Sequence, residues 1–190
     1  MSDDAIDPVY RALIAGELDP ADLSARRIGK LLGKTTSVLY HHFGSLDGFL
    51  FAVSQRGYAD LRAKLEAVFA SNHDLADVAE AFVQFGLDHR ELYPLMFERR
   101  FDWDGLRAAG AFETPTASGE MVAALLCLLE AGGSPNPIAD GRLLWAGLHG
   151  LVSLAASGRM NVGELTKKDR AVAIAAARDL AHRLVPEKRK

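Results

Sequence analysis

Residues 24–43 carry side chains whose types and spacing suit contacts with a nucleic-acid duplex. The four cations of this stretch are Arg26, Arg27, Lys30 and Lys34, and it holds no acid, in a chain whose formal net charge is −3. Such concentrated positive charge attracts a phosphate backbone. Hydroxyl and imidazole groups follow, and these can donate to phosphates or to base edges. The candidate contact residues are Ser24, Arg26, Lys30, Lys34, Thr35, Thr36, Ser37, Tyr40, His41 and His42.

Two short helices joined by a tight turn would present these side chains. Ser24 can cap the start of a helix, and Gly33 stands where a left-handed residue ends one. Thr35 can cap the next helix, and apolar residues recur at three- and four-residue steps in both halves. The pattern predicts a helix-turn-helix, whose second helix can enter a DNA major groove. A hairpin in an ordinary helical bundle is the alternative, although a bundle has no need for a cationic face.

Residues 39–43 read Leu-Tyr-His-His-Phe and are the most specific part of a longer similarity. The matching positions are Ile28, Gly29, Gly33, Thr35, Leu39, Tyr40, Phe43, Ser45 and Leu50. On these residues, the stretch 23–53 resembles the DNA-binding segment of TetR-type transcriptional regulators. The resemblance implies an all-α homodimer that binds a palindromic DNA operator, more often as a repressor than as an activator. Two positions depart from the family pattern, since Lys34 replaces a small apolar residue and Leu46 replaces a lysine that touches phosphate.

The composition also favours an all-α protein. Of the 190 residues, 49% are hydrophobic and only 8% are aromatic, and β-branched residues never gather into alternating runs. Cys127 is the single cysteine, which excludes an intramolecular disulfide and a cysteine-based zinc site. The sequence shows no signal peptide and no apolar run of the roughly 20 residues that a membrane span needs. We therefore expect a cytoplasmic protein with no membrane partner.

The chain divides into two predicted domains, a DNA-binding domain of residues 1–46 and a dimerisation and ligand-binding domain of residues 47–190. The first helix is expected to begin with Asp7 as its cap and Pro8 in its first turn. Residues 98–119 show no sustained period and could form either a lid over a pocket or a surface connection. The other helices are expected near residues 46–70, 75–89, 92–97, 115–131, 138–157 and 167–184.

A second, more degenerate resemblance covers the rear domain. Residues 82–97 resemble the start of a C-terminal domain found in one TetR-type subgroup, and Trp145, His149 and Gly150 match its Trp-then-His-Gly signature. The resemblance favours a mostly apolar pocket for a small hydrophobic or amphipathic ligand. Core packing is the alternative, because aromatic residues and Met serve both uses. The candidate lining residues are Phe82, Phe85, His89, Tyr93, Met96, Phe97, Trp103, Met121, Leu125, Trp145 and His149.

The last two predicted helices are expected to form a homodimer interface. The first of them is apolar nearly all round, and the second is rich in alanine, which lets another helix approach closely. Two-fold pairing would also place two recognition helices about 34 Å apart along one face of a duplex.

Catalysis and metal binding have little support in the sequence. It contains no GxSxG, P-loop, HExxH or dinucleotide motif, and Cys127 lies in an apolar helical run where a thiol usually serves packing. His89 and His149 would need at least a third ligand to hold a metal ion. We therefore expect no enzyme activity, no cofactor and no metal. The competing classes are a helical small-molecule or lipid-binding module without a DNA-binding role, and a structural adaptor without a pocket.

Overall fold

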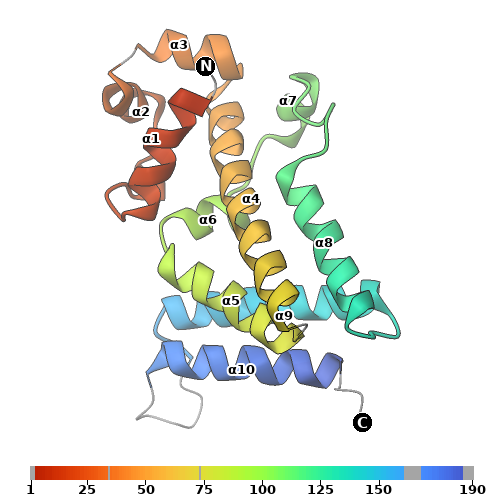
Figure 1. Ribbon diagram of the computed structural model, residues 1–190. Helices are drawn as coiled ribbons and strands as arrows, with labels where there is room; N and C mark the ends of the chain where they lie inside the picture. The colour runs from red at the N-terminus through yellow and green to blue at the C-terminus, as the bar shows by residue number, and fades with distance from the viewer. Residues whose placement is uncertain (1–2, 34, 73, 161–167, 186–190) are drawn as a thin grey trace. The chain divides into compact units, whose positions relative to one another are not determined.

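The computed structural model describes residues 3–33, 35–72, 74–160 and 168–185, and every regular element within these ranges is helical (Figure 1). This confirms the all-α class. One 3₁₀ turn, η1 (Pro20–Asp22), follows the first helix. The α-helices are α1 (Asp3–Ile14), α2 (Ala25–Leu32), α3 (Thr36–Phe43), α4 (Leu46–Asn72), α5 (Leu75–Asp88), α6 (Leu92–Phe97), α7 (Trp103–Ala108), α8 (Ala117–Ala131), α9 (Pro137–Ala156) and α10 (Asp169–Leu184).

The helices fall into two compact units, each of which combines distant parts of the sequence. Unit 1 holds residues 1–60 and 89–119, and unit 2 holds residues 61–88 and 120–190. The chain therefore changes unit three times, inside α4, at the end of α5 and inside α8. The functional boundary expected after residue 46 stays a prediction.

Local capping explains where α2, α3 and α4 begin and end. Ser24 Oγ accepts the backbone N–H three residues ahead at 3.3 Å, and Gly33 ends α2 in the left-handed conformation with φ of 60°. Thr35 has the extended backbone of an N-cap before α3, but its side chain makes no capping hydrogen bond. At the start of α4, Ser45 Oγ accepts the backbone N–H three residues ahead at 2.9 Å. The sequence-based helix-turn-helix boundaries are confirmed.

The expected start of the first helix was wrong. α1 begins at Asp3 rather than at Asp7, so that Pro8 lies inside it as the sixth residue. A proline near the N-terminus removes only one helical hydrogen bond, to the carbonyl four residues back. Val9 and Leu13 are at most 1% exposed and anchor the helix beyond the proline.

The irregular segment expected over residues 98–119 contains a helix, α7. Asp102 caps this helix by accepting the Gly105 N–H at 3.0 Å, and Leu106 is buried beneath it. A Cβ added to Gly105 would lie 2.3 Å from Asp102 Oδ2, so a larger residue there would require the capping carboxylate to shift. Six residues are too few to display an apolar period, which is why the sequence pattern did not predict α7.

Helices α5, α9 and α10 run side by side and pack together in unit 2 (Figure 1). Ala173, Ala177 and Ala181 of α10 are at most 2% exposed and lie four residues apart, so they form one small-residue stripe. Small side chains let helix axes approach closely. Gly147 of α9 leaves room for the Leu180 side chain of α10, because an added Cβ would lie 2.3 Å from a methyl carbon of Leu180.

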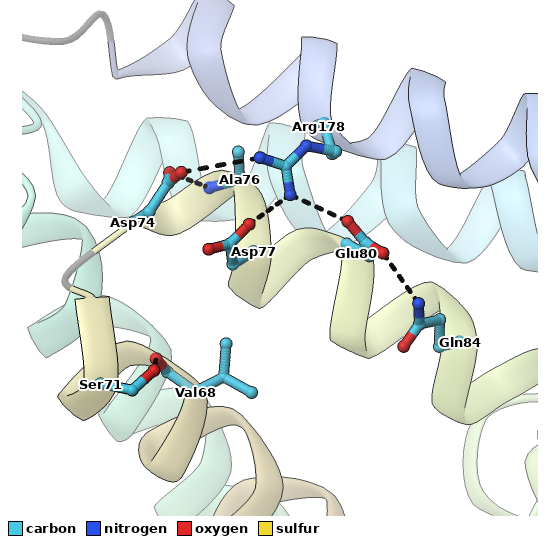
Figure 2. A network of polar contacts seen from close by, with 8 residues as sticks. All are labelled: Val68, Ser71, Asp74, Ala76, Asp77, Glu80, Gln84 and Arg178. Atoms are coloured by element: carbon cyan, nitrogen blue, oxygen red, sulfur yellow. Dashed lines mark hydrogen bonds and ion pairs between the residues drawn. The ribbon is translucent and has the colours of Figure 1, made fainter.

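A charged cluster joins α10 to α5 (Figure 2). One nitrogen of the Arg178 guanidinium donates to Glu80 at 2.8 Å and to Asp77, and another lies 3.7 Å from Asp74. Gln84 also donates to Glu80 at 2.8 Å. The hydrogen bonds that Arg178 donates to Asp77 and Glu80 raise the pKa of Arg178. The four ionic side chains are 28–35% exposed, so solvent screens the cluster only partly.

Unit 1 has its own core, built from α1, α2, α4 and α6. Each large apolar side chain in such a core contributes roughly 1.5–3 kcal/mol on burial. Helix α2 contributes to this core and contacts α1, and α3 in turn packs against α2. The core members at most 1% exposed are Val9, Leu13, Ile28, Phe49, Leu50, Val53, Leu92 and Leu95.

Candidate nucleic-acid interface

Helices α2 and α3 pack against each other and leave one face of α3 outward. Ile28 of α2 is 0% exposed and Leu39 of α3 is 4% exposed, whereas the neighbouring Tyr40 is 48% exposed. Since successive residues in a helix are about 100° apart, burial of Leu39 determines which side chains of α3 face solvent. The outward face is the one that carries the hydroxyl and imidazole groups.

The described candidate contact residues all lie at the surface. Ser24 is exposed, but its hydroxyl oxygen already caps α2. Lys34 lies outside the described residues. These placements leave the side chains accessible to a duplex, and the contacts themselves stay predictions. The other exposed candidates are Arg26, Lys30, Thr35, Thr36, Ser37, Tyr40, His41 and His42.

The charge of this surface is positive. Arg27 lies 3.7 Å from Asp22, and both side chains are more than half exposed, so their attraction is weak. Arg26 and Lys30 add exposed positive charge on the same helix. The rings of His41 and His42 in the last turn of α3 meet edge to face at 5.2 Å, and imidazole nitrogens can donate to phosphate or base oxygens.

Close backbone packing joins α3 to α4. A Cβ added to Gly48 would lie 2.1 Å from the carbonyl oxygen of Phe43, so this approach requires glycine. Gly44 makes the bend with φ of 70°, and the rings of Phe43 and Phe49 meet edge to face at 5.0 Å. The orientation of α3 therefore follows the first turn of α4.

Asp47 holds that first turn of α4 within unit 1. Arg99 Nη2 donates to Asp47 Oδ1 at 2.7 Å, and the Asp102 backbone N–H donates to Oδ2 at 2.9 Å. Burial alone would raise the pKa of Asp47, but these two hydrogen bonds and the Arg99 charge outweigh it and lower the pKa below its usual value. Sequence analysis missed this contact, because the partners are 52 and 55 residues away along the chain.

Four candidate ligand-binding residues meet at one cavity of unit 2. Its volume is about 20 Å³, which is room for about one water molecule, whereas ligand pockets span roughly 300–1,000 Å³. Side chains therefore fill this space in the present conformation. The candidates at the cavity are Phe82, Met121, Leu125 and Trp145, and the other lining residues are Leu65, Val78, Ala79, Leu144 and Leu148.

The remaining ligand candidates lie elsewhere. In unit 2, Phe85 is buried and His149 is half-buried, and neither lines the cavity. The others belong to unit 1, where they pack with one another or lie at its surface. These are His89, Tyr93, Met96, Phe97 and Trp103.

Within unit 1, several of these residues pack closely against other side chains. The rings of Tyr93 and Phe97 lie 4.4 Å apart, and the Tyr58 hydroxyl donates to the Met96 carbonyl at 2.6 Å. Burial raises the pKa of both tyrosines. Trp103 is 50% exposed and belongs to a cluster of rings at the start of α7. Its neighbours in that cluster are Phe51, Phe101 and Phe112.

Three further properties concern metal, membrane and thiol chemistry. Within the described ranges, no group of three or more His, Cys, Asp or Glu side chains is arranged to hold a metal ion. None of the described helices is long and apolar enough to cross a membrane. Cys127 is exposed on α8, so the expectation that it is a packing residue was wrong.

Comparison with known proteins identifies the family. The sequence model described as "Tetracyclin repressor-like, C-terminal domain" matches residues 75–179, which is more than half of the chain. The chain therefore belongs to the tetracycline repressor-like family, a family of transcriptional regulators. The match includes Trp145, His149 and Gly150, while membership in the subgroup with that signature stays a prediction. No curated protein matches the sequence.

Solved structures share the fold over nearly the whole chain. SCO4313, whose name describes it as a regulatory protein, is 22% identical with a TM-score of 0.65, and 94% of each chain is covered. A protein of unknown function from Rhodococcus sp. RHA1 is 23% identical with a TM-score of 0.64, covering 93% of this chain and 95% of that one. The TetR family transcriptional regulator PfmR from Thermus thermophilus is 16% identical with a TM-score of 0.59, covering 94% and 97%. At these identities the likeness concerns the fold.

Proposed function

We propose that this chain is a DNA-binding transcriptional regulator that binds a palindromic operator as a homodimer, with α3 as its recognition helix. The observation that carries the proposal is the outward face of α3, where Thr36, Ser37 and Tyr40 are exposed while Leu39 is buried. Membership in the tetracycline repressor-like family supports it. A recognition helix contacts base edges mainly through its N-terminal residues. Thr36 and Ser37 therefore suit base contacts, and Tyr40 and Lys34 suit phosphate.

The experiment is a selection of bound fragments from a random-duplex library, followed by fluorescence anisotropy over a range of salt concentrations. Lys30→Gln should weaken binding to all duplexes alike and reduce the slope of log affinity against log salt by about 0.9. Thr36→Ala should instead cost about 1–3 kcal/mol on the selected duplex and relax specificity at one position. The two variants thus separate phosphate contact from base contact.

Lys168→Gln is the matched control for charge. Lys168 is exposed in unit 2, outside the α2–α3 surface, so the same loss of one positive charge should leave affinity and salt slope unchanged. No retained duplex at low salt would reject the proposal. That result would favour a helical small-molecule or lipid-binding module without a DNA-binding role.

Exposed apolar side chains on α9 support the homodimer. Leu143 is 58% exposed and Leu154 is 42% exposed. They are eleven residues apart, which is about three helical turns, so they lie on one face. A Cβ added to Gly150, on the same helix, would have no neighbour within 4 Å. We propose that a second copy covers this face together with α10.

A small apolar or amphipathic ligand is proposed to modulate DNA affinity, with repression as the direction of control. Because the cavity of unit 2 is nearly filled, such a ligand must displace side chains, of which Trp145 is the largest at the cavity. It can change DNA affinity only if it binds one conformation better than the other. The test titrates a Trp103→Phe variant with a panel of apolar compounds and follows Trp145 fluorescence. If operator affinity is unchanged at saturation with every binder, ligand coupling is rejected.

A further inference from the structure

A continuous series of contacts leads from residues 99–102 to the recognition helix. Arg99 and the Asp102 N–H bind the two carboxylate oxygens of Asp47 at 2.7 and 2.9 Å. Asp47 lies in the first turn of α4, next to Gly48, whose Cα packs against the last carbonyl of α3. Every member of this series belongs to unit 1.

The ion pair in this series is partly shielded from solvent. The side chains of Arg99 and Asp47 are 29% and 24% exposed, whereas those of the nearby pair Arg107 and Asp104 are 69% and 96% exposed. The Arg99 guanidinium also lies 5.5 Å from the centre of the Phe101 ring. A charge-assisted hydrogen bond whose two side chains make further contacts restrains their relative position more strongly than an exposed ion pair does.

We propose that Asp47 is a positioning residue for DNA binding. It holds the first turn of α4 on residues 99–102 and thereby sets the orientation of α3. The inference rests on the proposed DNA-binding function and adds a residue that does not touch DNA. A negative charge close to α3 repels phosphates, so any contribution of Asp47 in favour of DNA binding must come from geometry.

The sign of the charge makes the experiment decisive. Asp47→Asn removes one negative charge, and electrostatics alone would then raise the affinity for every duplex. Positioning predicts instead that the ratio of affinity for the selected duplex to affinity for random duplex falls by at least about fivefold. Affinity for random duplex should stay equal or rise. Both affinities are measured by anisotropy on the full chain, at a temperature where urea titration shows each variant to be fully folded.

Two arginine variants and one matched carboxylate complete the design. Arg99→Gln removes the cation but keeps the bond from the Asp102 N–H, so it should lower the ratio as well, and it replaces Asp47→Asn if that variant does not fold. Arg99→Lys keeps the positive charge and should retain most of the ratio. Asp104→Asn makes the same chemical change at an exposed carboxylate in the first turn of α7 and should leave the ratio unchanged.

The outcomes distinguish failure of the positioning role from failure of the proposed DNA-binding function. If the wild type prefers no duplex, the proposed function is rejected and the positioning role with it. If the wild type prefers its selected duplex but Asp47→Asn and Arg99→Gln keep the same ratio, only the positioning role is overturned. An equal fall of the ratio in Asp104→Asn would also overturn it, because the effect would then be a general property of acids in unit 1.

Discussion

The phenolic O–H of Tyr10 donates a 2.6 Å hydrogen bond to Oδ2 of Asp60, which joins α1 to α4 across fifty residues of sequence. Burial raises the pKa of Tyr10, and the hydrogen bond to Asp60 and its charge raise it further. Arg56 completes the group, since its guanidinium lies 5.6 Å from the centre of the Tyr10 ring and its Nε lies 3.3 Å from Asp60 Oδ1. These three side chains hold α1 on α4.

Tyr10→Phe should lower the free energy of unfolding by about 0.5–1.5 kcal/mol, because one partly buried hydrogen bond is lost while the ring is kept. Urea titration at neutral pH measures the change. Tyr40→Phe is the matched control, since Tyr40 is 48% exposed, and it should change stability by less than about 0.5 kcal/mol. An equal loss in both variants would show that the Tyr10 hydroxyl has no special structural role.

The contrast between caps and long-range contacts explains what the sequence could predict. Ser24 and Gly33 act on backbone groups within four residues of themselves, so their spacing alone predicted α2 and the turn. Asp47 and Tyr10 bind partners about fifty residues away, and no local pattern reports such pairs. The all-α class and most helix boundaries depend on local periodicity and were therefore predictable.

The candidate ligand residues show a second limit of sequence analysis. Phe82 and Trp145 do meet, with ring centres 6.0 Å apart, but the cavity that they line is about 20 Å³. Aromatic residues and Met fill a core as readily as they line a pocket. Residue type therefore predicted that Phe82 and Met121 are buried in unit 2, and it could not predict how much space their neighbours leave.

Gly48→Ala should destabilise the protein although alanine is the better helix former. The added Cβ would meet the Phe43 carbonyl oxygen at 2.1 Å, so the backbone between α3 and α4 must shift. We expect a loss of about 1–3 kcal/mol in the free energy of unfolding, as for other overpacked sites. Ala52→Gly, one turn further along α4, measures the difference in helix propensity between alanine and glycine. It should lower the free energy of unfolding by about 0.5–1 kcal/mol. A Gly48→Ala variant as stable as the wild type would show that the backbone between α3 and α4 can shift without cost.

The stability contributed by Asp47 should depend on pH. Its pKa is lowered in the folded protein, so its contribution is fully present above the unfolded carboxyl pKa of about 3.9 and is lost as the pH falls through the folded value. The difference in unfolding free energy between wild type and Asp47→Asn should therefore be constant near neutral pH and shrink below about pH 4. Urea titrations across this range measure it. A difference that grows on acidification would contradict the direction of the shift.

Arg178 should stabilise the contact between α10 and α5 chiefly because its positive charge offsets the repulsion among three neighbouring carboxylates. Arg178→Gln leaves Asp74, Asp77 and Glu80 close together without their shared cation (Figure 2). We expect a loss of about 1–3 kcal/mol, and part of it should return at high salt because salt screens the remaining repulsion. Arg170→Gln is the control, since that arginine pairs with Asp88 at 2.8 Å with both side chains nearly half exposed. It should lose less than about 1 kcal/mol.

Leu143→Glu should convert a dimer into a monomer if α9 carries the interface between copies. A charge placed at the centre of an apolar contact must be desolvated without a partner, which opposes association. Sedimentation velocity measures the oligomeric state, and the same variant should bind the selected duplex more weakly because two recognition helices no longer act together. Val122→Glu is the matched control: Val122 is 46% exposed on α8, outside the last two helices, and should leave the dimer intact. Dissociation by Val122→Glu and not by Leu143→Glu would move the interface to α8.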